Sequence, residues 1–294
     1  MRPARVAVIG GSGFYEMESL TEPEEVRQST PFGDPSDSIV LGTLHGVRMA
    51  FLPRHGRGHR ILPTEVPTRA NIYALKSLGV EFIISISAVG SLREELQPLH
   101  LVVPDQIIDR TRARPSTFFG GGLVAHVAMA DPFCPVLSDI VHESAREADA
   151  TVHRGGTYVA VEGPAFSTRA ESHLYRSWGA DVIGMTALPE AKLAREAEIC
   201  YVTLASVTDY DCWYEAHAEV TAEMILDNLR RSVVTCRRVV ANAVQRLPEA
   251  RRCLCASALD SALVTPFDLV PDQTKKGLAP IIGRFLARTG EGPR

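Results

Sequence analysis

The stretch Val6-Ala7-Val8-Ile9-Gly10-Gly11-Ser12-Gly13 decides the fold, because a short apolar run passes directly into a turn of small residues. A strand followed by glycines is typical of an α/β domain in which the backbone approaches a ligand and points amide groups at an anion. A dinucleotide fingerprint needs Gly-x-Gly-x-x-Gly, but counted from Gly11 the third glycine is replaced by Glu16. We therefore favour a phosphate contact through the backbone and the Ser12 hydroxyl, with a plain tight turn or an NAD site as alternatives.

The rest of the sequence alternates short apolar runs with amphipathic stretches, which predicts an α/β domain. The predicted strands cover residues 5–9, 38–44, 47–52, 82–88, 101–104, 157–162, 182–184 and 200–208. The predicted helices cover residues 68–78, 135–149, 169–178, 189–197 and 218–246. No change of composition marks a boundary, so we predict one domain over residues 1–294 with a C-terminal elaboration from about residue 247. We expect loop and short strand over 251–269 and a helical turn over 280–286.

Composition and charge exclude several classes of function. Of 294 residues, 31 are Lys or Arg and 35 are Asp or Glu, which gives a net charge of −4. This balance argues against nucleic acid or an anionic membrane as a general partner, so any attraction for an anionic substrate must be local. The first residues lead straight into the short strand, without the apolar run of a secretory leader or a membrane span. We therefore expect a cytoplasmic protein.

Six cysteines are too few for a disulfide scaffold in a chain of this length. Cys134, Cys200, Cys212 and Cys236 are scattered, and each is expected to be a buried, inert thiol. In Cys253-Leu254-Cys255 the two thiols could join only in a tight, strained ring, so two half-buried thiols are the favoured interpretation. We do not expect zinc there, because no second Cys or His pair lies at ligand spacing in the sequence.

The strand predicted over 47–52 is followed by Arg54 and His55, which together suit an anion. A guanidinium group binds two phosphate oxygens at once, and the imidazole beside it can donate from either ring nitrogen. The alternative is a solvated basic loop, because Arg57, His59 and Arg60 follow closely.

Small and hydroxyl-bearing residues follow two other predicted strands. Ser87 and Ala88 stand at the end of the strand predicted over 82–88 and offer a hydroxyl and a backbone N–H that nothing bulky shields. Thr186 precedes Pro189 in the position of a helix N-cap, from which its hydroxyl can also face a ligand. Since the carboxyl ends of parallel strands form ligand sites in such folds, we expect Ser87 to converge with Ser12 and Arg54 at one edge of the sheet.

The segment Thr208-Asp209-Tyr210-Asp211 carries an acidic pair after the last predicted strand. Residues two apart in a strand face the same side, so the two carboxylates would repel unless one has a raised pKa or a partner. Adenine offers a donor at N6 and an acceptor at N7, and one ionised and one protonated carboxyl group would satisfy both. A metal site and a solvated turn are the alternatives, and the neighbouring sequence favours neither.

These motifs together resemble the trimeric branch of the purine nucleoside phosphorylases, in the subgroup that cleaves 5′-methylthioadenosine. The similarity runs in order from about residue 6 to about 245. The matching runs include Gly10-Gly11-Ser12-Gly13, Thr30-Pro31-Phe32-Gly33, Arg54-His55-Gly56, Asp131-Pro132-Phe133-Cys134, Glu162-Gly163-Pro164, Gly184-Met185-Thr186 and Thr208-Asp209-Tyr210-Asp211-Cys212-Trp213.

The resemblance implies a fold and a reaction. The fold would be a single domain with a central mixed β-sheet flanked by helices. The reaction would be phosphorolysis of 5′-methylthioadenosine to adenine and 5-methylthioribose 1-phosphate, in purine and methionine salvage. Inorganic phosphate would be the co-substrate, without a cofactor or a metal, and the working unit would be a homotrimer or a dimer of trimers.

The resemblance also assigns residues to roles, with Asp209 and His55 as the catalytic pair. Asp209 would act at purine N7 and Asp211 at N6. The phosphate site would consist of Ser12, Arg54, His55, Ser87, Ala88 and Thr186. The nucleoside site would consist of Phe166, Ser167, Met185, Thr208, Asp209 and Asp211, with His126 reaching the 5′ group bound by a neighbouring subunit.

Other functions remain open at this point. A 6-oxopurine nucleoside phosphorylase is the nearest alternative, followed by an NAD-dependent oxidoreductase, a non-catalytic nucleoside-binding protein and a nucleosidase that uses water. Beyond Leu247 the similarity to the animal enzymes fades, which leaves the selectivity at the 5′ position open. Cys253-Leu254-Cys255 is similar to a motif that forms disulfides in some archaeal or thermophilic members, so the redox state of this pair is open too.

Overall fold

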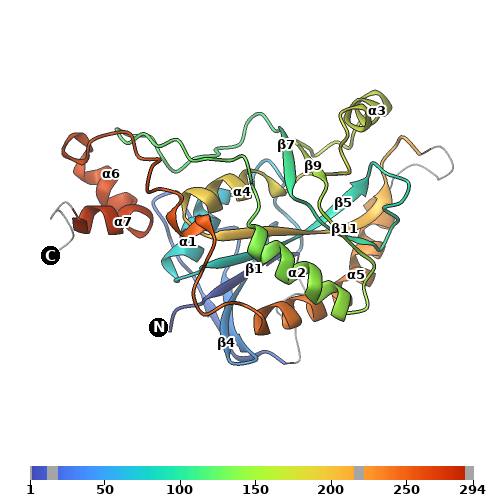
Figure 1. The fold of residues 1–294 in the computed structure, drawn as a ribbon, viewed down its shortest axis with the longest axis horizontal. Coiled ribbons are helices and arrows are strands. Elements are labelled where there is room, and N and C mark those ends of the chain that lie inside the picture. The colour runs from blue at the N-terminus through green and yellow to red at the C-terminus, as the bar shows by residue number, and fades with distance from the viewer. Residues whose placement is uncertain (1, 12–18, 215–221, 289–294) are drawn as a thin grey trace.

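Two long strands form the middle of the sheet and carry the site at one end. The computed structural model describes residues 2–11, 19–214 and 222–288. The strands are β1 (Val6–Gly10), β2 (Thr21–Val26), β3 (Ile39–Leu44), β4 (Val47–Pro53), β5 (Phe82–Ser91), β6 (Leu101–Val103), β7 (Gln106–Arg110), β8 (Val152–Arg154), β9 (Thr157–Val161), β10 (Val182–Gly184) and β11 (Cys200–Tyr210). They form one sheet with the path β2-β3-β4-β1-β5-β10-β9-β7, and β11 lies along β5 off this path (Figure 1).

The pairing of these strands brings four carboxyl ends together. β1 is parallel to β4 and to β5, and β5 is parallel to β11 over nearly its whole length. The same edge therefore receives the ends of β1, β4, β5 and β11, as the motifs predicted. β3 is antiparallel to β4, and β10 is antiparallel to the end of β5. The sheet is mixed, which confirms the predicted fold class.

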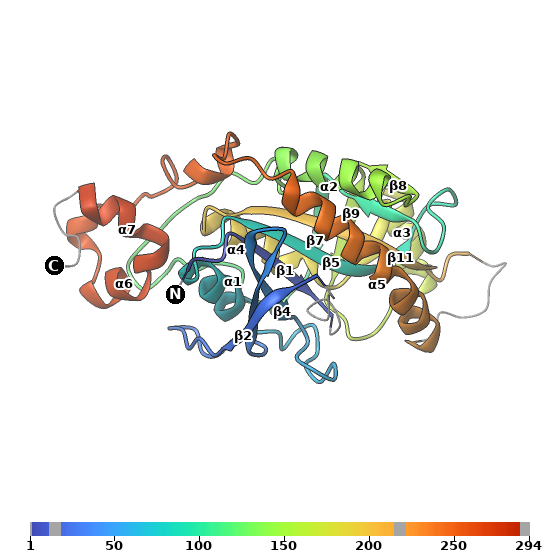
Figure 2. The ribbon, with the colours of Figure 1, turned by 90° about the horizontal axis from the view of Figure 1, so that it is seen from below.

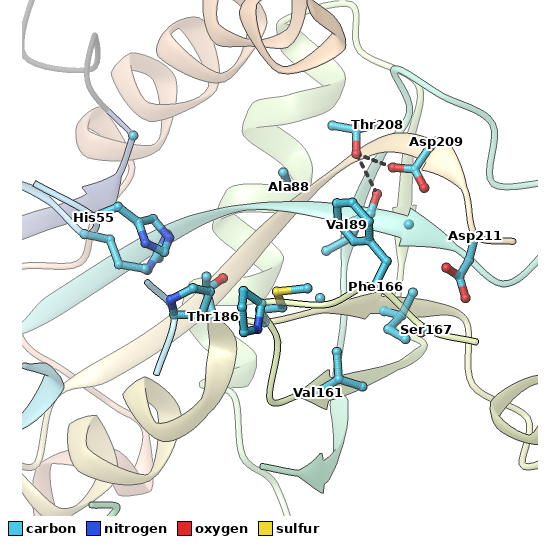
Figure 3. Close-up of a pocket in the computed structure, with 18 of the residues that line it drawn as sticks. His55, Ala88, Val89, Val161, Phe166, Ser167, Thr186, Thr208, Asp209 and Asp211 are labelled. Carbon is cyan, nitrogen blue, oxygen red and sulfur yellow. Dashed lines mark hydrogen bonds between the residues drawn. The ribbon is translucent and has the colours of Figure 1, made fainter. Parts of the chain in front are cut away.

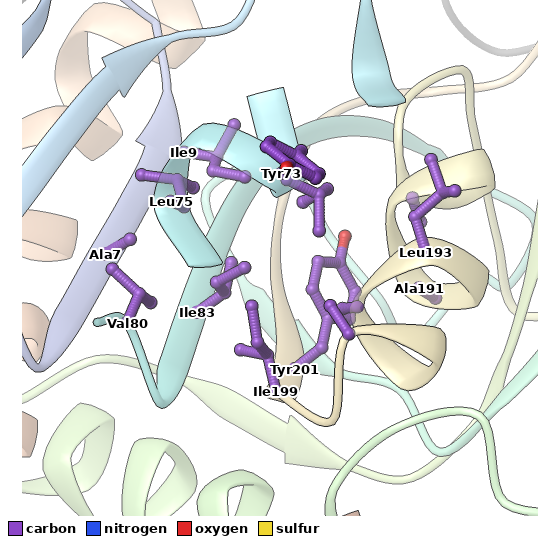
Figure 4. Close-up of a cluster of buried hydrophobic side chains, with 14 of the residues drawn as sticks. Ala7, Ile9, Tyr73, Leu75, Val80, Ile83, Ala191, Leu193, Ile199 and Tyr201 are labelled. Carbon is purple, nitrogen blue, oxygen red and sulfur yellow. The ribbon is translucent and has the colours of Figure 1, made fainter. Parts of the chain in front are cut away.

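Helices cover both faces of the sheet because its strands are apolar on both sides. The helices are α1 (Thr68–Ser77), α2 (Pro135–Glu147), α3 (Arg169–Ser177), α4 (Ala187–Glu196), α5 (Ala222–Gln245), α6 (Asp272–Gly277) and α7 (Ala279–Arg288). In β1, Val6 and Val8 pack in the cluster with α2 and α5, whereas Ala7 and Ile9 pack in the cluster with α1 and α4 (Figures 2 and 4). Full burial of one such aliphatic side chain stabilises the fold by about 1.5–3 kcal/mol relative to exposure.

Several elements differ from the sequence prediction. β5 continues to Ser91, three residues past its predicted end, because it pairs there with β10 and β11. β2, β7, β8 and α6 were not predicted; β2 is exposed along most of its length and so lacks an apolar pattern. The segment 251–269 holds two short 3₁₀ helices, η1 (Leu254–Ser257) and η2 (Phe267–Leu269), where we expected a short strand. The predicted start of α5 at residue 218 lies outside the described residues.

The C-terminal residues extend the fold beyond the sheet. α7 packs against α1, Ile281 and Ile282 are buried in the same hydrophobic cluster as Ile72, and the Tyr73 hydroxyl donates to the carbonyl of Gly277 at 2.8 Å. Figure 1 shows α6 and α7 at one end of the molecule, with the extended chain before α2 running towards them. Among the described residues, no helix is both long and apolar enough to span a bilayer.

Candidate active site

A cavity of about 570 Å³ opens where the four parallel strands end. That volume is in the range of pockets that bind a small molecule. Figure 3 shows its labelled side chains arranged from His55 at one end to Asp211 at the other. The lining residues are Gly11, Arg54, His55, His59, Leu62, Pro63, Ile86, Ala88, Val89, Gly90, Val161, Pro164, Phe166, Ser167, Ile183, Gly184, Met185, Thr186, Thr208, Asp209 and Asp211.

The cavity gathers most of the residues predicted from the sequence. The predicted residues that line it are Arg54, His55, Ala88, Phe166, Ser167, Met185, Thr186, Thr208, Asp209 and Asp211. Ser87 lies behind the wall, almost completely buried. His126 is exposed on the extended segment before α2 and does not line the cavity of its own chain. Ser12 lies outside the described residues.

Arg54 is fixed by a buried ion pair rather than left free. Its Nε donates to Glu190 Oε1 at 2.5 Å and its Nη2 to Oε2 at 3.2 Å, and both side chains are almost completely buried. Burial alone would lower the pKa of Arg54, but Glu190 more than offsets this and the pKa is raised. Nη1 donates to the carbonyl of Ile86 at 2.9 Å, its one acceptor among the described residues. Nη1 therefore has one hydrogen without an acceptor among the described residues, and the ion pair restrains the guanidinium group.

Glu190 is itself held by two hydroxyl groups. Ser85 Oγ donates to Glu190 Oε2 at 2.8 Å, and the Tyr201 hydroxyl donates to the same oxygen at 2.9 Å. Both hydroxyl groups donate to Oε2, and together with the guanidinium group they offset the cost of burying the carboxylate charge. The sequence analysis treated Arg54 as a free phosphate ligand, and it missed the acid 136 residues further along the chain.

His55 is neutral at physiological pH, and its orientation fixes which nitrogen is the acceptor. Nδ1 lies 2.8 Å from the carbonyl oxygen of Ile61, which can only accept, so Nδ1 carries the proton. Burial, followed by the charge of Arg54, lowers the pKa of His55 to about 4. Nε2 is therefore a hydrogen-bond acceptor, and His55 is not the double donor that the sequence left open. The ring stacks on His59 at 4.3 Å between centroids.

Three hydroxyl groups support the wall between β5 and α4. Ser87 Oγ lies 2.8 Å from Thr186 Oγ1 and 3.1 Å from the Tyr158 hydroxyl. Thr186 is the N-cap residue of α4, as predicted, but its hydroxyl makes no cap and turns to Ser87 instead. A Cβ atom at Gly184 would lie 2.0 Å from the Tyr158 hydroxyl, so only glycine leaves room for this contact. Ser87 thus orients Thr186 from behind the cavity.

The acidic pair occupies the opposite end of the cavity, and both carboxyl groups are buried. Burial raises the pKa of Asp209 to about 6, against the hydrogen bond that Thr208 Oγ1 donates to Oδ1 at 2.7 Å. Burial also raises the pKa of Asp211, whose Oδ2 is buried without a hydrogen bond among the described residues. A Cβ atom at Gly90 would lie 3.2 Å from Asp209 Oδ2 and 3.4 Å from Asp211 Cβ, so Gly90 provides the space for both. The two predicted acids thus line the same cavity, and the charge of Asp211 adds a smaller upward effect on the pKa of Asp209.

Arg114 was missed by the sequence analysis, although it connects two segments of the cavity wall. Its Nη1 donates to the carbonyls of Met185, at 2.5 Å, and Leu188, at 2.8 Å. Its Nη2 donates to the carbonyls of Val161, at 3.3 Å, and Glu162, at 2.5 Å. The sequence does not indicate this role of Arg114, because all four acceptors are backbone atoms at least 47 positions away.

Comparisons with known proteins agree with this geometry. A family model described as the phosphorylase superfamily matches residues 5–245. The chain is 58% identical to S-methyl-5′-thioadenosine phosphorylase of Geobacter sulfurreducens over 96% of this chain and 99% of the relative. It is 57% identical to the protein of the same name from Gloeobacter violaceus, over 97% of each chain.

Solved structures are similar over much of the chain. A methylthioadenosine phosphorylase from an antarctic soil metagenomic library superimposes with a TM-score of 0.92 at 53% identity, covering 96% of this chain and 99% of the other. A methylthioadenosine phosphorylase from Schistosoma mansoni in complex with adenine gives a TM-score of 0.78 at 40% identity, covering 82% and 91%.

Proposed function

Because the chain belongs to the phosphorylase superfamily, we propose that it cleaves S-methyl-5′-thioadenosine with inorganic phosphate, giving adenine and 5-methylthioribose 1-phosphate. One observation supports this choice of substrate: the cavity has a fixed cation and a neutral imidazole at one end and two buried acids at the other. The first end suits an anion and the second suits a base that both donates and accepts.

Phosphate is expected at the end formed by Arg54, His55, Ala88 and Thr186. The remaining Nη1 hydrogen of Arg54, the backbone N–H of Ala88 and the Thr186 hydroxyl are donors for its charged oxygens. The Nε2 acceptor of His55 suits the P–OH group of monohydrogen phosphate. We keep Ser12 in this set on the family resemblance, and Ser87 as the residue that orients Thr186.

Adenine is expected at the acidic end. An Asp209 carboxyl group with a pKa of about 6 can be protonated at pH 7 for about 1.4 kcal/mol, against about 4 kcal/mol for an ordinary aspartate. The protonated group can donate to N7, which makes adenine a better leaving group. Asp211 accepts from the N6 amino group, and Phe166, half exposed at the mouth, covers the base with Ser167.

The chemistry then needs no enzyme nucleophile. Phosphate attacks C1′ of the ribose while the C1′–N9 bond breaks, and the pair of electrons passes into the purine as N7 is protonated. Met185 and Thr208 complete the wall around the nucleoside. The protein contributes orientation and fixed charges, the two effects that dominate when the substrates themselves react.

His126 and the oligomeric state belong to the same proposal. The side chain is exposed on the extended segment, and its backbone N–H donates to the carbonyl of Ala262 at 2.9 Å. Since this segment lies outside its own cavity, His126 can act only on a substrate held by a neighbouring copy. We therefore propose a homotrimer or a dimer of trimers as the working unit.

The function is tested with a panel of nucleosides, with and without phosphate. Adenine release from methylthioadenosine should require phosphate and should exceed hypoxanthine release from methylthioinosine at least about tenfold in kcat/KM, or about 1.4 kcal/mol. Equal or reversed preference would favour a 6-oxopurine enzyme. Turnover that is unchanged when phosphate is removed would instead indicate a nucleosidase that uses water.

Asp211→Asn is expected to relax the choice between the two bases. An amide can donate to a 6-oxo group, so the ratio of adenine to hypoxanthine release should fall about tenfold or more. Because Asp209 is intact in this variant, turnover of the better substrate should remain measurable. A ratio equal to that of the unaltered enzyme would contradict the role of Asp211 at N6.

A further inference from the structure

Four cysteines that are far apart in the sequence meet at the amino end of β11. The sulfur atoms of Cys134, Cys200, Cys253 and Cys255 all lie within 4.8 Å of one another. Cys134, Cys200 and Cys255 are almost completely buried, and Cys253 is half-buried. Spacing along the chain argued against a second pair of ligands, but the fold supplies that pair from two different elements.

The backbone around each cysteine is fixed. Cys134 is the N-cap residue of α2, and its N–H donates to the carbonyl of Tyr201 at 2.8 Å. Cys200 begins β11, and its N–H donates to the carbonyl of Glu81 at 2.9 Å. Cys253 precedes η1 and Cys255 lies within it, so one short turn provides two sulfurs. The four side chains therefore converge on one point without any rearrangement of the core.

The distances suit a shared ion better than a covalent bond. Cys200 Sγ and Cys253 Sγ are 3.2 Å apart, well beyond the S–S bond length of about 2.05 Å. Four thiolates at about 2.3 Å from a tetrahedral zinc lie about 3.8 Å from each other, which falls between 3.2 Å and the 4.8 Å limit of the cluster. Arg195 Nη1 lies 3.8 Å from Cys255 Sγ and brings positive charge to a site that would be anionic.

We propose that these four cysteines bind one structural zinc ion. Each S–H bond would be exchanged for an S–Zn bond with release of the proton, so no electrons move and no oxidant is needed. Four protein ligands leave no open position, which distinguishes a structural site from a catalytic one. β11 spans about 30 Å from Cys200 to Asp209, so this site is separate from the substrate cavity.

The position of the cluster indicates what the ion does. Cys253 and Cys255 lie where the chain leaves α5 and continues towards α6 and α7, whereas Cys134 and Cys200 belong to the core. Zinc would therefore tie the C-terminal part of the chain to the sheet. Removal of the zinc ion should lower the Tm and should leave the KM for phosphate almost unchanged.

The first test measures metal in the full-length protein, purified under a non-chelating reductant. We expect about one zinc per chain by elemental analysis. After removal of zinc, cobalt(II) should give the charge-transfer and visible bands of tetrahedral thiolate coordination. Less than about a tenth of a zinc per chain after reduction and reconstitution, or iron in place of zinc, would overturn the proposal. So would peptide mapping that finds these cysteines joined in disulfides in freshly isolated protein.

A pair of variants locates the site. Cys255→Ser should lower the zinc content at least about tenfold and lower the Tm, whereas Cys236→Ser should leave the zinc content unchanged. Cys236 is a matched control because it is equally buried but lies in α5, outside the cluster. If Cys255→Ser does not fold, Cys253→Ser at the half-buried position gives the same comparison. Zinc retained by both cluster variants would contradict the assignment.

Discussion

Asp209→Asn should reduce turnover by about 10²-fold or more, the usual scale for loss of a general acid. Asparagine keeps the shape of the side chain and can still accept from Thr208, but its amide cannot transfer a proton to N7. The KM for phosphate should change little, because His55 and Thr186 lie away from Asp209 in the cavity (Figure 3), and Arg54 directly precedes His55. Steady-state kinetics with methylthioadenosine measure both. Turnover within about threefold of the unaltered enzyme would exclude Asp209 as the acid.

The pH dependence separates this role from simple misfolding. With a pKa of about 6, the protonated fraction of Asp209 falls tenfold for each pH unit above 6, so kcat/KM should fall as the pH rises through that range. The asparagine variant should lose this limb, whereas the ionisation of phosphate affects both proteins alike. Folding raises the pKa of Asp209 from 3.8 to about 6. The group therefore contributes stability that is fully present below pH 3.8 and is lost as the pH rises through 6. At pH 8 the variant should therefore be at least as stable as the unaltered enzyme, despite its loss of turnover.

The acidic pair was predictable because its information is local. Asp209 and Asp211 come at the end of an apolar strand at a spacing of two, and two carboxylates on one side of a strand require a raised pKa or a partner. The position of Arg54 was predictable too, because β4 is parallel to β1 and ends at the same edge of the sheet. Thr186 follows β10, which is antiparallel to β5, so the rule for parallel strands does not account for its position. A local sequence pattern is sufficient to predict a site residue whose position depends only on the strand that carries it.

Partners far apart in the chain were not predictable, because nothing in the sequence records which segments meet. Glu190 pairs with Arg54 only through the packing of α4 on the sheet, and Arg114 contacts backbone atoms that any residue would supply. The convergence of Cys134 and Cys200 with Cys253 and Cys255 was missed for the same reason, since spacing along the chain does not report distance in space. His126 is a different case, because its expected partner is a second copy of the chain.

Glu190→Gln should cause the largest loss of stability among the changes considered. It leaves the Arg54 guanidinium group buried without a counter-charge, and breaking a buried pair from one side costs about 3–5 kcal/mol. For a domain of this size, that corresponds to a fall in Tm of roughly 10 °C. Thermal unfolding of the two proteins in a buffer without phosphate measures the effect.

The effect of phosphate on the Tm shows whether the Arg54 guanidinium group, left without its counter-charge in this variant, faces the substrate. If Arg54 contacts phosphate, the anion supplies the missing counter-charge in the folded state alone, so saturating phosphate should raise the Tm of Glu190→Gln more than that of the unaltered enzyme. Glu196→Gln is the matched control: Glu196 is also buried in α4, but it accepts from Thr117 and Phe118 and does not line the cavity. That variant should lose stability without gaining sensitivity to phosphate. If phosphate raises the Tm of Glu190→Gln no more than it does for Glu196→Gln, the charge of Arg54 is directed elsewhere, and the phosphate site needs another cation.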